Sequence, residues 1–348
     1  MSRDPTGDTA ITPPIESNII ETYATIGTQI ANAVGQRISG QHDLVHDTLI
    51  GLLAEGHVLL EGVPGLGKTE LVKAFAAAIG VDFGRVQFTP DLMPADIVGT
   101  QVLEEDEHGR RKFIYQAGPL FTNLLLADEV NRATPKTQSA LLEAMQERSV
   151  TVGGATRLLP RPFLVMATQN PIELEGTYPL PEAQLDRFMM KISVQRPEIA
   201  VVEEILRRTT SEQVPDVPHV ADEATITHMT VVSRQVPIAS HLLRYVAGIV
   251  DATHPDSPEA TDAIRRYVRW GASPRGAQSM VLAAKVRALL DGRPHVSATD
   301  IRASAPSTLR HRLVLGYEAT ADGVASDDLL AAVIERIPEP TAAVRGTP

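Results

Sequence analysis

The stretch Gly62-Val63-Pro64-Gly65-Leu66-Gly67-Lys68-Thr69 decides the fold of this 348-residue chain. It matches the phosphate-loop pattern G-x-x-x-x-G-K-[ST] at every fixed position. Residues 57–61 before it predict a short buried strand, and residues 70–79 after it predict a helix that Gly80 ends. A strand, a glycine loop and a helix in this order are the context in which the pattern binds phosphate, so we expect a nucleotide site here.

The chemistry of this site follows from the backbone of the loop. Its glycines allow conformations that a Cβ would forbid, so the N–H groups can point inward and surround phosphate oxygens. The start of the following helix adds the positive end of its dipole. Lys68 is then expected to reach the β- and γ-phosphates, and the Thr69 hydroxyl to hold Mg²⁺. The alternative, an accidental match in a glycine-rich turn, does not explain the flanking strand and helix.

The composition is that of an ordinary soluble protein, and it excludes several classes of function. Apolar residues make up 43% of the chain, and the formal charge of -11 disfavours a general nucleic-acid coat, which needs basic residues to meet phosphates. The absence of cysteine excludes disulfides, thiol catalysis and cysteine metal sites. There is no apolar run near the ~18 residues that cross a bilayer, and the polar start is not a secretory signal. These features predict a cytoplasmic protein.

A second motif follows the apolar run at residues 124–127. Such a run is typical of a strand buried on both faces, and Asp128 and Glu129 come directly after it, where ligands bind in open α/β sheets. Asp128 is expected to anchor the Mg²⁺ shell, and Glu129 to orient and polarise the attacking water. Two adjacent acids also occur by chance, but in a chain with a phosphate loop chance is a poor explanation.

Three further polar residues are candidates for the site. Asn170 ends a predicted buried strand, where it could contact the γ-phosphate or the water, although such an Asn is otherwise usually a turn residue. Arg187 is the second candidate, and the alternative is that it is a solvated arginine on the surface. Arg275 falls in the first turn of a helix with Ser273 as N-cap and Pro274 as first residue. The helix dipole disfavours a cation there unless an anion is near, so we expect Arg275 to meet phosphates; the alternative is a partly exposed arginine.

Strands and helices alternate from residue 17 to residue 196, which predicts a nucleotide-binding domain of the α/β class with a parallel sheet. Two hairpins are expected within it, at residues 99–115 and 150–159. From residue 197 to residue 338 helical patterns recur between prolines without a strand-like run, which predicts a smaller all-helical domain. The two ends of the chain are predicted to be disordered or flexible and comprise residues 1–16 and 339–348.

Taken together, these residues resemble the MoxR family of AAA+ ATPases. The resemblance covers about residues 20–335. It is carried by five motifs, which are GVPGLGKT (62–69), LLLADEVNR (124–132), ATQNP (167–171), LPEAQLDRF (180–188) and GASPRG (271–276). The resemblance implies an ASCE-type P-loop sheet sandwiched by helices, then a helical lid. It also implies assembly as a homo-oligomeric ring, usually a hexamer, with ATP and Mg²⁺ as ligands.

The resemblance implies roles for individual residues. Asn170 is similar to sensor 1, Arg187 to the arginine finger and Arg275 to sensor 2. Residues 99–118 resemble the helix-2 insert and residues 150–159 the hairpin before sensor 1, and in that family both face the ring pore. The implied nucleotide contacts border the adenine or belong to the phosphate loop, and they are Ile38, Gly40, Gln41, Gly62, Pro64, Gly65, Leu66, Gly67, Lys68, Thr69 and Glu70.

The expected activity is ATP hydrolysis, with ATP·Mg between the sheet domain and the lid of one subunit and Arg187 supplied by a neighbour. The resemblance implies a chaperone-like remodeller of a protein client, often with a partner that bears a von Willebrand factor A-like domain. Two other classes stay open. One is a helicase-like nucleic-acid motor, which the acidic charge disfavours, and the other is a nucleotide-gated assembly scaffold. A small-molecule kinase would leave Asn170, Arg187 and Arg275 without a common role.

Overall fold

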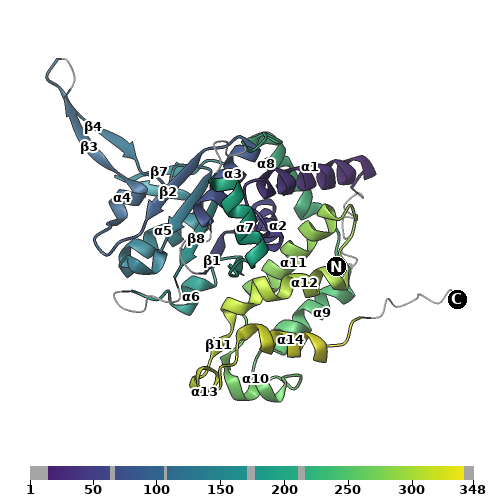
Figure 1. Cartoon of the computed structure of the whole chain (residues 1–348). Helices are drawn as coiled ribbons and strands as arrows, with labels where there is room; N and C mark the ends of the chain where they lie inside the picture. Colours follow the sequence, from purple (N-terminus) through teal and green to yellow (C-terminus); the bar gives the residue numbers. More distant parts are fainter. Residues whose placement is uncertain (1–14, 63–66, 106–107, 171–176, 211–215, 341–348) are drawn as a thin grey trace, which may run out of the picture.

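A five-stranded parallel sheet lies at the centre of the fold (Figure 1). The computed structural model describes residues 15–62, 67–105, 108–170, 177–210 and 216–340. The strand order is β2-β5-β8-β1-β9, and every neighbouring pair is parallel. The strands are β1 Val58–Glu61, β2 Phe83–Gln87, β5 Leu124–Asp128, β8 Leu164–Gln169 and β9 Met190–Ser193. The parallel α/β sheet that the sequence predicts is therefore confirmed.

The middle strands are continuous apolar runs because both of their faces are covered. Successive residues point to opposite faces, so Leu60 joins one hydrophobic cluster and Leu59 the other. Because the strands are parallel, their carboxyl ends meet at one edge of the sheet. The register places Gln87 of β2 beside Asp128 of β5 at that edge. Polar side chains that are distant in sequence are thereby brought together.

Helices cover both faces of the sheet. The first layer packs on the face of Leu60 and the second on the face of Leu59. The first layer consists of α1 Ser17–Gly35, α2 His42–Leu53 and α3 Lys68–Ile79. The second consists of α4 Pro94–Val98, α5 Pro135–Glu147, α6 Glu182–Leu185 and the 3-10 turn η1 Val130–Arg132. The sandwich expected for the sheet is therefore present.

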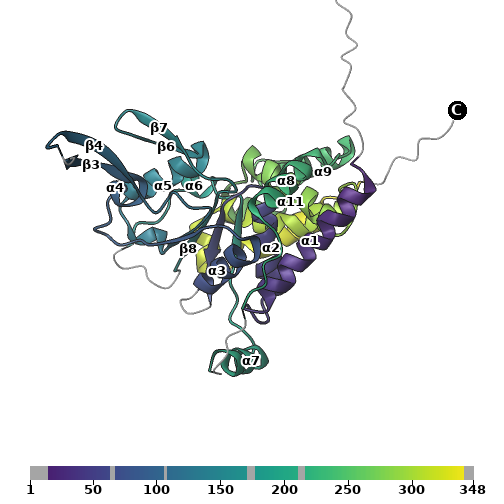
Figure 2. The same cartoon turned by 90° about the horizontal axis from the view of Figure 1, so that it is seen from above.

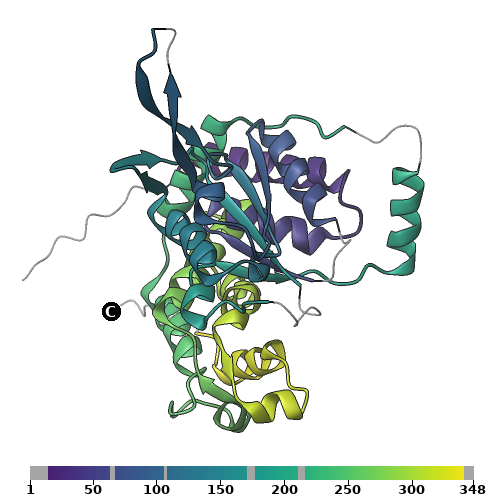
Figure 3. The same cartoon turned by 90° about the vertical axis from the view of Figure 1, so that its left-hand side faces the viewer.

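Two antiparallel hairpins project from the sheet domain (Figures 1 and 3). They are formed by β3 Gly99–Glu105 with β4 Arg111–Ala117, and by β6 Ser149–Val152 with β7 Ala155–Leu158. Both predicted hairpins are confirmed. The longer one carries the cross-strand pair Leu103 and Phe113, whose exposed fractions are 53% and 65%. Its apolar side chains are therefore available to a second molecule.

The remaining elements are mostly helical. They are α7 Ile199–Thr209, α8 Glu223–Gln235, α9 Ser240–Asp251, α10 Asp262–Tyr267, β10 Val268–Trp270, α11 Pro274–Leu290, α12 Ala298–Leu309, η2 Arg310–Arg312, β11 Val314–Leu315, α13 Tyr317–Ala321 and α14 Ser326–Arg336. Helix α7 stands apart from the rest in Figures 2 and 3. Strands β10 and β11 form an antiparallel pair, so the expectation of an all-helical region is wrong in this detail. Strands of two or three residues are too short to show the alternation of apolar and polar side chains that predicts a strand.

The helical part, α8 to α14, shares a hydrophobic core with the sheet domain. One cluster contains Leu60 of β1, Val34 of α1, Leu289 of α11 and Leu330 of α14. The two predicted domains therefore do not have separate cores, and the helical part packs on α1, α2 and β9. No helix in the described part of the chain is long and apolar enough to span a bilayer. The predictions for residues 1–14 and 341–348 fall outside the described residues.

Candidate nucleotide-binding site

A pocket of about 300 Å³ opens at the edge where the parallel strands end. We call it the phosphate pocket. Its described lining residues are Gly62, Gly67, Lys68, Thr69, Glu70, Arg85, Gln87, Asp128, Glu129, Thr168 and Asn170. The structure therefore brings together both acids of the second motif, Asn170 and the described end of the phosphate loop, as the sequence predicts.

The phosphate loop leads directly into α3. Residues 63–66 are outside the described residues, and so are three predicted contacts, Pro64, Gly65 and Leu66. Gly67 has a φ of 80°, in the left-handed region that favours glycine. This residue turns the chain into α3, whose first residue is Lys68. The first N–H groups of a helix have no intrahelical acceptor, so the start of α3 suits an anion in the pocket.

Lys68 places a cation in the phosphate pocket. Its Nζ donates a hydrogen bond to the Gly62 carbonyl. Burial lowers the pKa of Lys68, while the charges of Asp128 and Glu129 counteract this. A phosphate group would add negative charge beside the ammonium group and favour its charged form. The electrostatics of the pocket therefore favour an anionic ligand.

Asp128 is fixed by two neighbours. Arg85 Nη2 lies 2.7 Å from Asp128 Oδ2, and Thr168 Oγ1 donates to Asp128 Oδ1 at 2.7 Å. Thr168 Oγ1 also accepts a hydrogen bond of 2.7 Å from the Glu129 N–H. The Thr168 hydroxyl thus joins both acids across the neighbouring strands β5 and β8, and it holds them in a defined geometry.

Glu129 lies in an unusual backbone conformation at the end of β5. Its φ is 55°, in a region that costs a residue with a side chain of order 1–3 kcal/mol. Its carboxylate accepts a hydrogen bond of 2.8 Å from Gln87 Nε2 and pairs with Arg132 Nη1 at 3.0 Å. Strain of this kind concentrates at functional sites. The carboxylate therefore faces the phosphate pocket while two protein groups hold it.

The donor set of this pocket fits a magnesium ion carried by a nucleotide. Thr69 supplies a hydroxyl group and Asp128 a carboxylate. Within the described residues, no cluster of three or more His, Cys, Asp or Glu side chains could hold a metal ion. Mg²⁺ is usually bound by one or two carboxylates together with substrate phosphates. The pocket thus suits nucleotide-bound Mg²⁺ rather than a metal centre made of protein groups alone.

Sequence reasoning missed Arg85 and Gln87, although both lie in the phosphate pocket. They occupy a strand that the sequence does predict. Their connection to Asp128 and Glu129 depends on β2 lying beside β5 in the sheet. One sequence does not reveal that order, so these residues carry no signal of their own.

A second pocket, of about 460 Å³, lies between the loop before α2 and the chain after β9. We call it the base pocket. The predicted adenine contacts Gly40 and Gln41 line it, together with Val194 and with Val201 of α7. It borders the phosphate pocket, because a Cβ at Gly62 would lie 2.9 Å from the Val194 backbone oxygen. Gln41 Oε1 is buried and has no hydrogen-bond partner among the described residues.

Ile38 is a core residue and does not line the base pocket. Its exposed fraction is 7%, and it packs in the cluster that contains α1 to α3. Its neighbour Arg37 instead pairs with Glu70 in the first turn of α3, with Nη2 2.7 Å from Oε2. This ion pair joins the loop beside the base pocket to the helix beside the phosphate pocket. That Ile38 borders adenine therefore stays a prediction.

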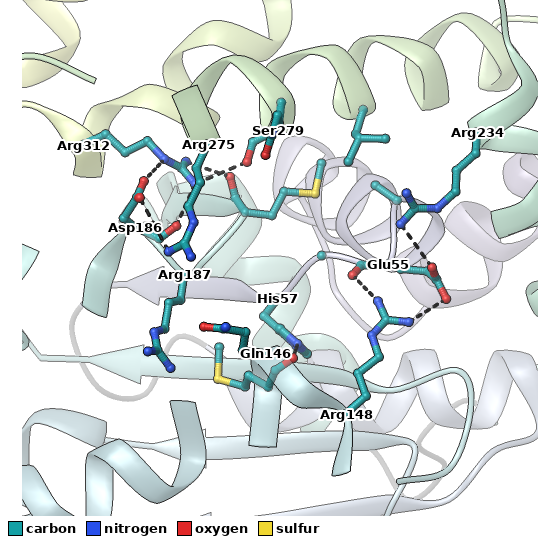
Figure 4. A pocket seen from close by; sticks show the side chains of 16 residues that line it. Glu55, His57, Gln146, Arg148, Asp186, Arg187, Arg234, Arg275, Ser279 and Arg312 are labelled. Carbon is teal, nitrogen blue, oxygen red and sulfur yellow. Dashed lines mark hydrogen bonds and ion pairs between the residues drawn. The ribbon is translucent and has the colours of Figure 1, made fainter. Parts of the chain in front are cut away.

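Arg187 and Arg275 lie in a third pocket of about 280 Å³, the arginine pocket (Figure 4). Among the described lining residues, it has none in common with the phosphate pocket. Arg187 Nη1 donates to the Leu142 carbonyl at 2.9 Å. Arg275 is 51% exposed, and its Nη1 lies 3.8 Å from Asp186 Oδ2. The structure brings the two predicted arginines together, but at a place separate from the phosphate pocket of the same chain.

Contrary to the expectation, the described residues of the helical part do not line the phosphate pocket or the base pocket. No residue of α8 to α14 is among the described lining residues of the phosphate pocket or the base pocket. The helical part contributes instead to the arginine pocket, through Arg234, Arg275 and Arg312 among others. The expectation that ATP lies between the sheet domain and the lid of one subunit therefore needs revision.

Comparisons with known proteins agree with these features. A family model described as "ATPase family associated with various cellular activities (AAA)" matches residues 57–190, and one described as "AAA lid domain" matches residues 260–333. Chaperone MoxR1 of Mycobacterium tuberculosis is 44% identical over 87% of this chain and 79% of its own length. Protein MoxR of Methylorubrum extorquens is 33% identical over 88% of this chain and 93% of its own length. A crystal structure from Cytophaga hutchinsonii, 39% identical, matches with a TM-score of 0.87 over 93% of this chain and 98% of that one.

Proposed function

The chain belongs to the MoxR family of AAA+ ATPases and hydrolyses ATP to ADP and phosphate, and on this premise we propose that each ATP binds at the seam between two copies of the chain. The separation of the phosphate pocket from Arg187 and Arg275 carries the proposal. A neighbour whose arginine pocket faces the phosphate pocket would complete the site. Repetition of this head-to-tail contact closes a ring, and six copies are the common number in AAA+ ATPases.

The residues of the phosphate pocket are proposed to bind and orient the triphosphate. Lys68 and the first N–H groups of α3 contact the β- and γ-phosphates. Thr69 and Asp128 would hold Mg²⁺, which when bound neutralises charge on these phosphates. Asn170, with an exposed fraction of 7%, lines the same pocket, where it can contact the γ-phosphate or the attacking water.

Glu129 is proposed to orient the attacking water. Its carboxylate is held by Gln87 and Arg132 in the described conformation. Both contacts go to Oε2, so Oε1 can accept a hydrogen bond from water while the carboxylate is held. Positioned bases of this kind contribute about 10²–10⁴ to a rate. The two donors thus hold one oxygen of the carboxylate and leave the other for water.

Arg187 and Arg275 are proposed to act together on the ATP of the neighbouring copy. This revises the expectation for Arg275, which the sequence assigns to the phosphates of its own subunit. Arginine fingers accelerate related reactions by about 10³–10⁵, which corresponds to about 4–7 kcal/mol of barrier. Since the arginine pocket is distinct from the phosphate pocket of the same chain, we expect slow turnover from isolated copies.

The base pocket is proposed to receive adenine. Its support is Gln41 Oε1, an unpaired acceptor among the described residues, which could bond the adenine amino group once the side chain turns to expose it. Gly40 and Val201 both line this pocket and pack against each other, since a Cβ at Gly40 would lie 2.4 Å from a Val201 methyl group.

Hydrolysis is proposed to drive chaperone-like remodelling of a protein client, with a von Willebrand factor A-domain protein as partner. The name of the relative Chaperone MoxR1 supports the chaperone role. The exposed Leu103 and Phe113 of the β3–β4 hairpin offer an apolar surface to such a client. A nucleic-acid motor is disfavoured by the charge of -11, and DNA-stimulated ATPase would favour it. A scaffold role would be favoured if the Glu129→Gln variant kept full output on the client.

The test of the shared site is the ATPase rate of mixed assemblies. Arg187→Ala copies keep an intact phosphate pocket, and Glu129→Gln copies keep an intact arginine pocket, so each variant alone is expected to be inactive. Mixed in equal amounts, they should recover about a quarter of the wild-type rate, because about half of the copies can hydrolyse and about half of these have a competent neighbour in a head-to-tail ring. A mixture as inactive as the separate variants would contradict the shared site.

A further inference from the structure

We propose that Arg312 is a positioning residue that holds Arg187 and Arg275 in the arrangement in which they reach the ATP of the neighbouring copy. The inference rests on the proposed shared site and adds a residue to it. Arg312 lies at the end of η2 in the helical part, and its side chain is 2% exposed. It therefore acts through other residues and does not touch the nucleotide.

Arg312 binds the backbone on both sides of Arg187. Its Nη2 donates to the Asp186 carbonyl at 3.1 Å and to the Phe188 carbonyl at 2.9 Å. Its Nη1 donates to the Met189 carbonyl at 3.2 Å. One guanidinium group thus fixes the residue before Arg187 and the two residues after it. These contacts fix the backbone position from which the Arg187 side chain extends.

The carboxylate of Asp186 extends this arrangement to Arg275. Arg312 Nε donates to Asp186 Oδ1 at 2.7 Å. The same carboxylate accepts from Ser273 Oγ at 2.9 and 3.0 Å and lies 3.8 Å from Arg275 Nη1. Figure 4 shows Arg275 and Arg312 converging on Asp186, while the Arg187 side chain extends the other way. Asp186 is therefore the link between the two arginines.

The helical part anchors Arg312 from the opposite side. Its guanidinium donates to the Thr308 carbonyl and to Ser279 Oγ, the latter at 3.2 Å. Next to it, His311 Nε2 lies 3.0 Å from the Phe188 carbonyl. Burial lowers the pKa of Arg312 while Asp186 opposes this, and an arginine stays charged in proteins. A movement of the helical part would thus move the backbone that carries Arg187.

Lysine cannot replace this set of contacts. Arginine has five N–H donors in a rigid planar fork, whereas lysine has one ammonium group on a flexible stem. Arg312→Lys keeps the charge beside Asp186 but cannot serve that carboxylate and the three carbonyls around Arg187 at the same time. Misplacement of a catalytic group by about 1 Å can cost about 10² in rate. We expect Arg312→Lys to lower kcat of the assembled protein about 10²-fold, with KM within about twofold, because the phosphate pocket is unchanged.

The matched control is Arg293→Lys. Arg293 also makes a forked ion pair in the helical part, with Nη1 and Nη2 at 2.7 and 2.6 Å from the Asp300 carboxylate. Arg293 is not among the described residues that line the arginine pocket. The control should lose stability without a change in kcat. A second test variant is Asp186→Asn, which removes the negative charge of the Asp186 side chain and keeps its size. It should also lower kcat.

Mixed assemblies distinguish a positioning role of Arg312 toward the neighbouring copy from a general effect on the folding or activity of its own copy. Arg312→Lys copies keep their own phosphate pocket, so mixing with Glu129→Gln copies should restore the rate as fully as mixing Arg187→Ala with Glu129→Gln. A wild-type kcat in Arg312→Lys, or no recovery while the Arg187→Ala mixture recovers, would overturn the inference. If Arg312→Lys does not fold, Asp186→Asn decides by the same two criteria. If the Arg187→Ala mixture itself fails to recover, the shared site is wrong and the role of Arg312 toward a neighbour falls with it.

Discussion

Gln87 Nε2 donates a hydrogen bond of 2.8 Å to Glu129 Oε2, so the carboxylate proposed to orient water is already engaged. The contact follows from the sheet, because the register of β2 and β5 pairs Gln87 with Asp128, the residue before Glu129. Arg132 holds the same carboxylate oxygen at 3.0 Å. The carboxylate is thus restrained through Oε2, and the loss of one donor would give it more freedom to approach the water.

Gln87→Ala should raise basal ATPase. A hydrogen bond to a charged group contributes about 1.5–3 kcal/mol, and only part of this is released because Arg132 remains. We expect a rise of about three- to tenfold in the rate of the assembled protein, measured as phosphate release at saturating ATP. Gln116→Ala, in the exposed strand β4, is the control and should leave the rate unchanged. A fall in rate for Gln87→Ala would show that the contact aligns Glu129 for catalysis.

Glu129→Gln and Lys68→Ala should differ in their effect on ATP binding. Glu129→Gln removes the group that activates water, so turnover should fall by at least about 10² while ATP affinity is kept. Lys68→Ala removes a phosphate contact and should weaken affinity itself. Titration with a fluorescent ATP analogue, alongside the ATPase rate, distinguishes the two. Normal turnover by Glu129→Gln would show that Glu129 does not orient the attacking water.

Gln41→Leu should weaken discrimination between ATP and GTP. Gln41 Oε1 is a buried acceptor whose missing donor an adenine amino group would supply, whereas guanine presents an oxygen at that position. The loss of one neutral hydrogen bond, about 0.5–1.5 kcal/mol, predicts a two- to tenfold smaller ratio of kcat/KM values. His42→Ala, in the same pocket, controls for general loosening. An unchanged ratio would mean that Gln41 does not read the base.

The stability of the fold should depend on pH through His57. The His57 ring is buried between the Met145 carbonyl and the Val165 N–H, both at 3.0 Å, so Nε2 donates and Nδ1 accepts. Burial lowers its pKa from 6.5 to about 4. The folded state therefore binds fewer protons than the unfolded state between these values, and stability that is complete above pH 6.5 is lost as the pH falls toward 4.

The expected loss over this range is roughly 3 kcal/mol from His57. Urea unfolding at several pH values and one fixed protein concentration would measure it. His57→Gln should flatten the dependence, while a residual slope should persist because burial also lowers the pKa of His311. An equally steep dependence in the variant would exclude His57 as its source.

Local patterns predicted much of this molecule. The start of α3 at Lys68 and the buried runs of β5 and β8 are continuous in sequence, so their structure and most of the described phosphate pocket could be predicted. Arg312 could not be, because its partner Asp186 is 126 residues away and no motif marks it. Arg275 was predicted as a site residue from a helix start that the structure confirms, with Ser273 as its N-cap. Which subunit it serves depends on how the helical part packs, and that is a tertiary property.

The most direct test of the shared site is the structure of assembled Glu129→Gln protein with ATP and Mg²⁺ bound. We predict that each γ-phosphate is contacted by Lys68 of one copy and by both Arg187 and Arg275 of the next. A structure in which Arg275 contacts the nucleotide of its own copy, or in which Arg187 is remote from every nucleotide of the ring, would contradict the account.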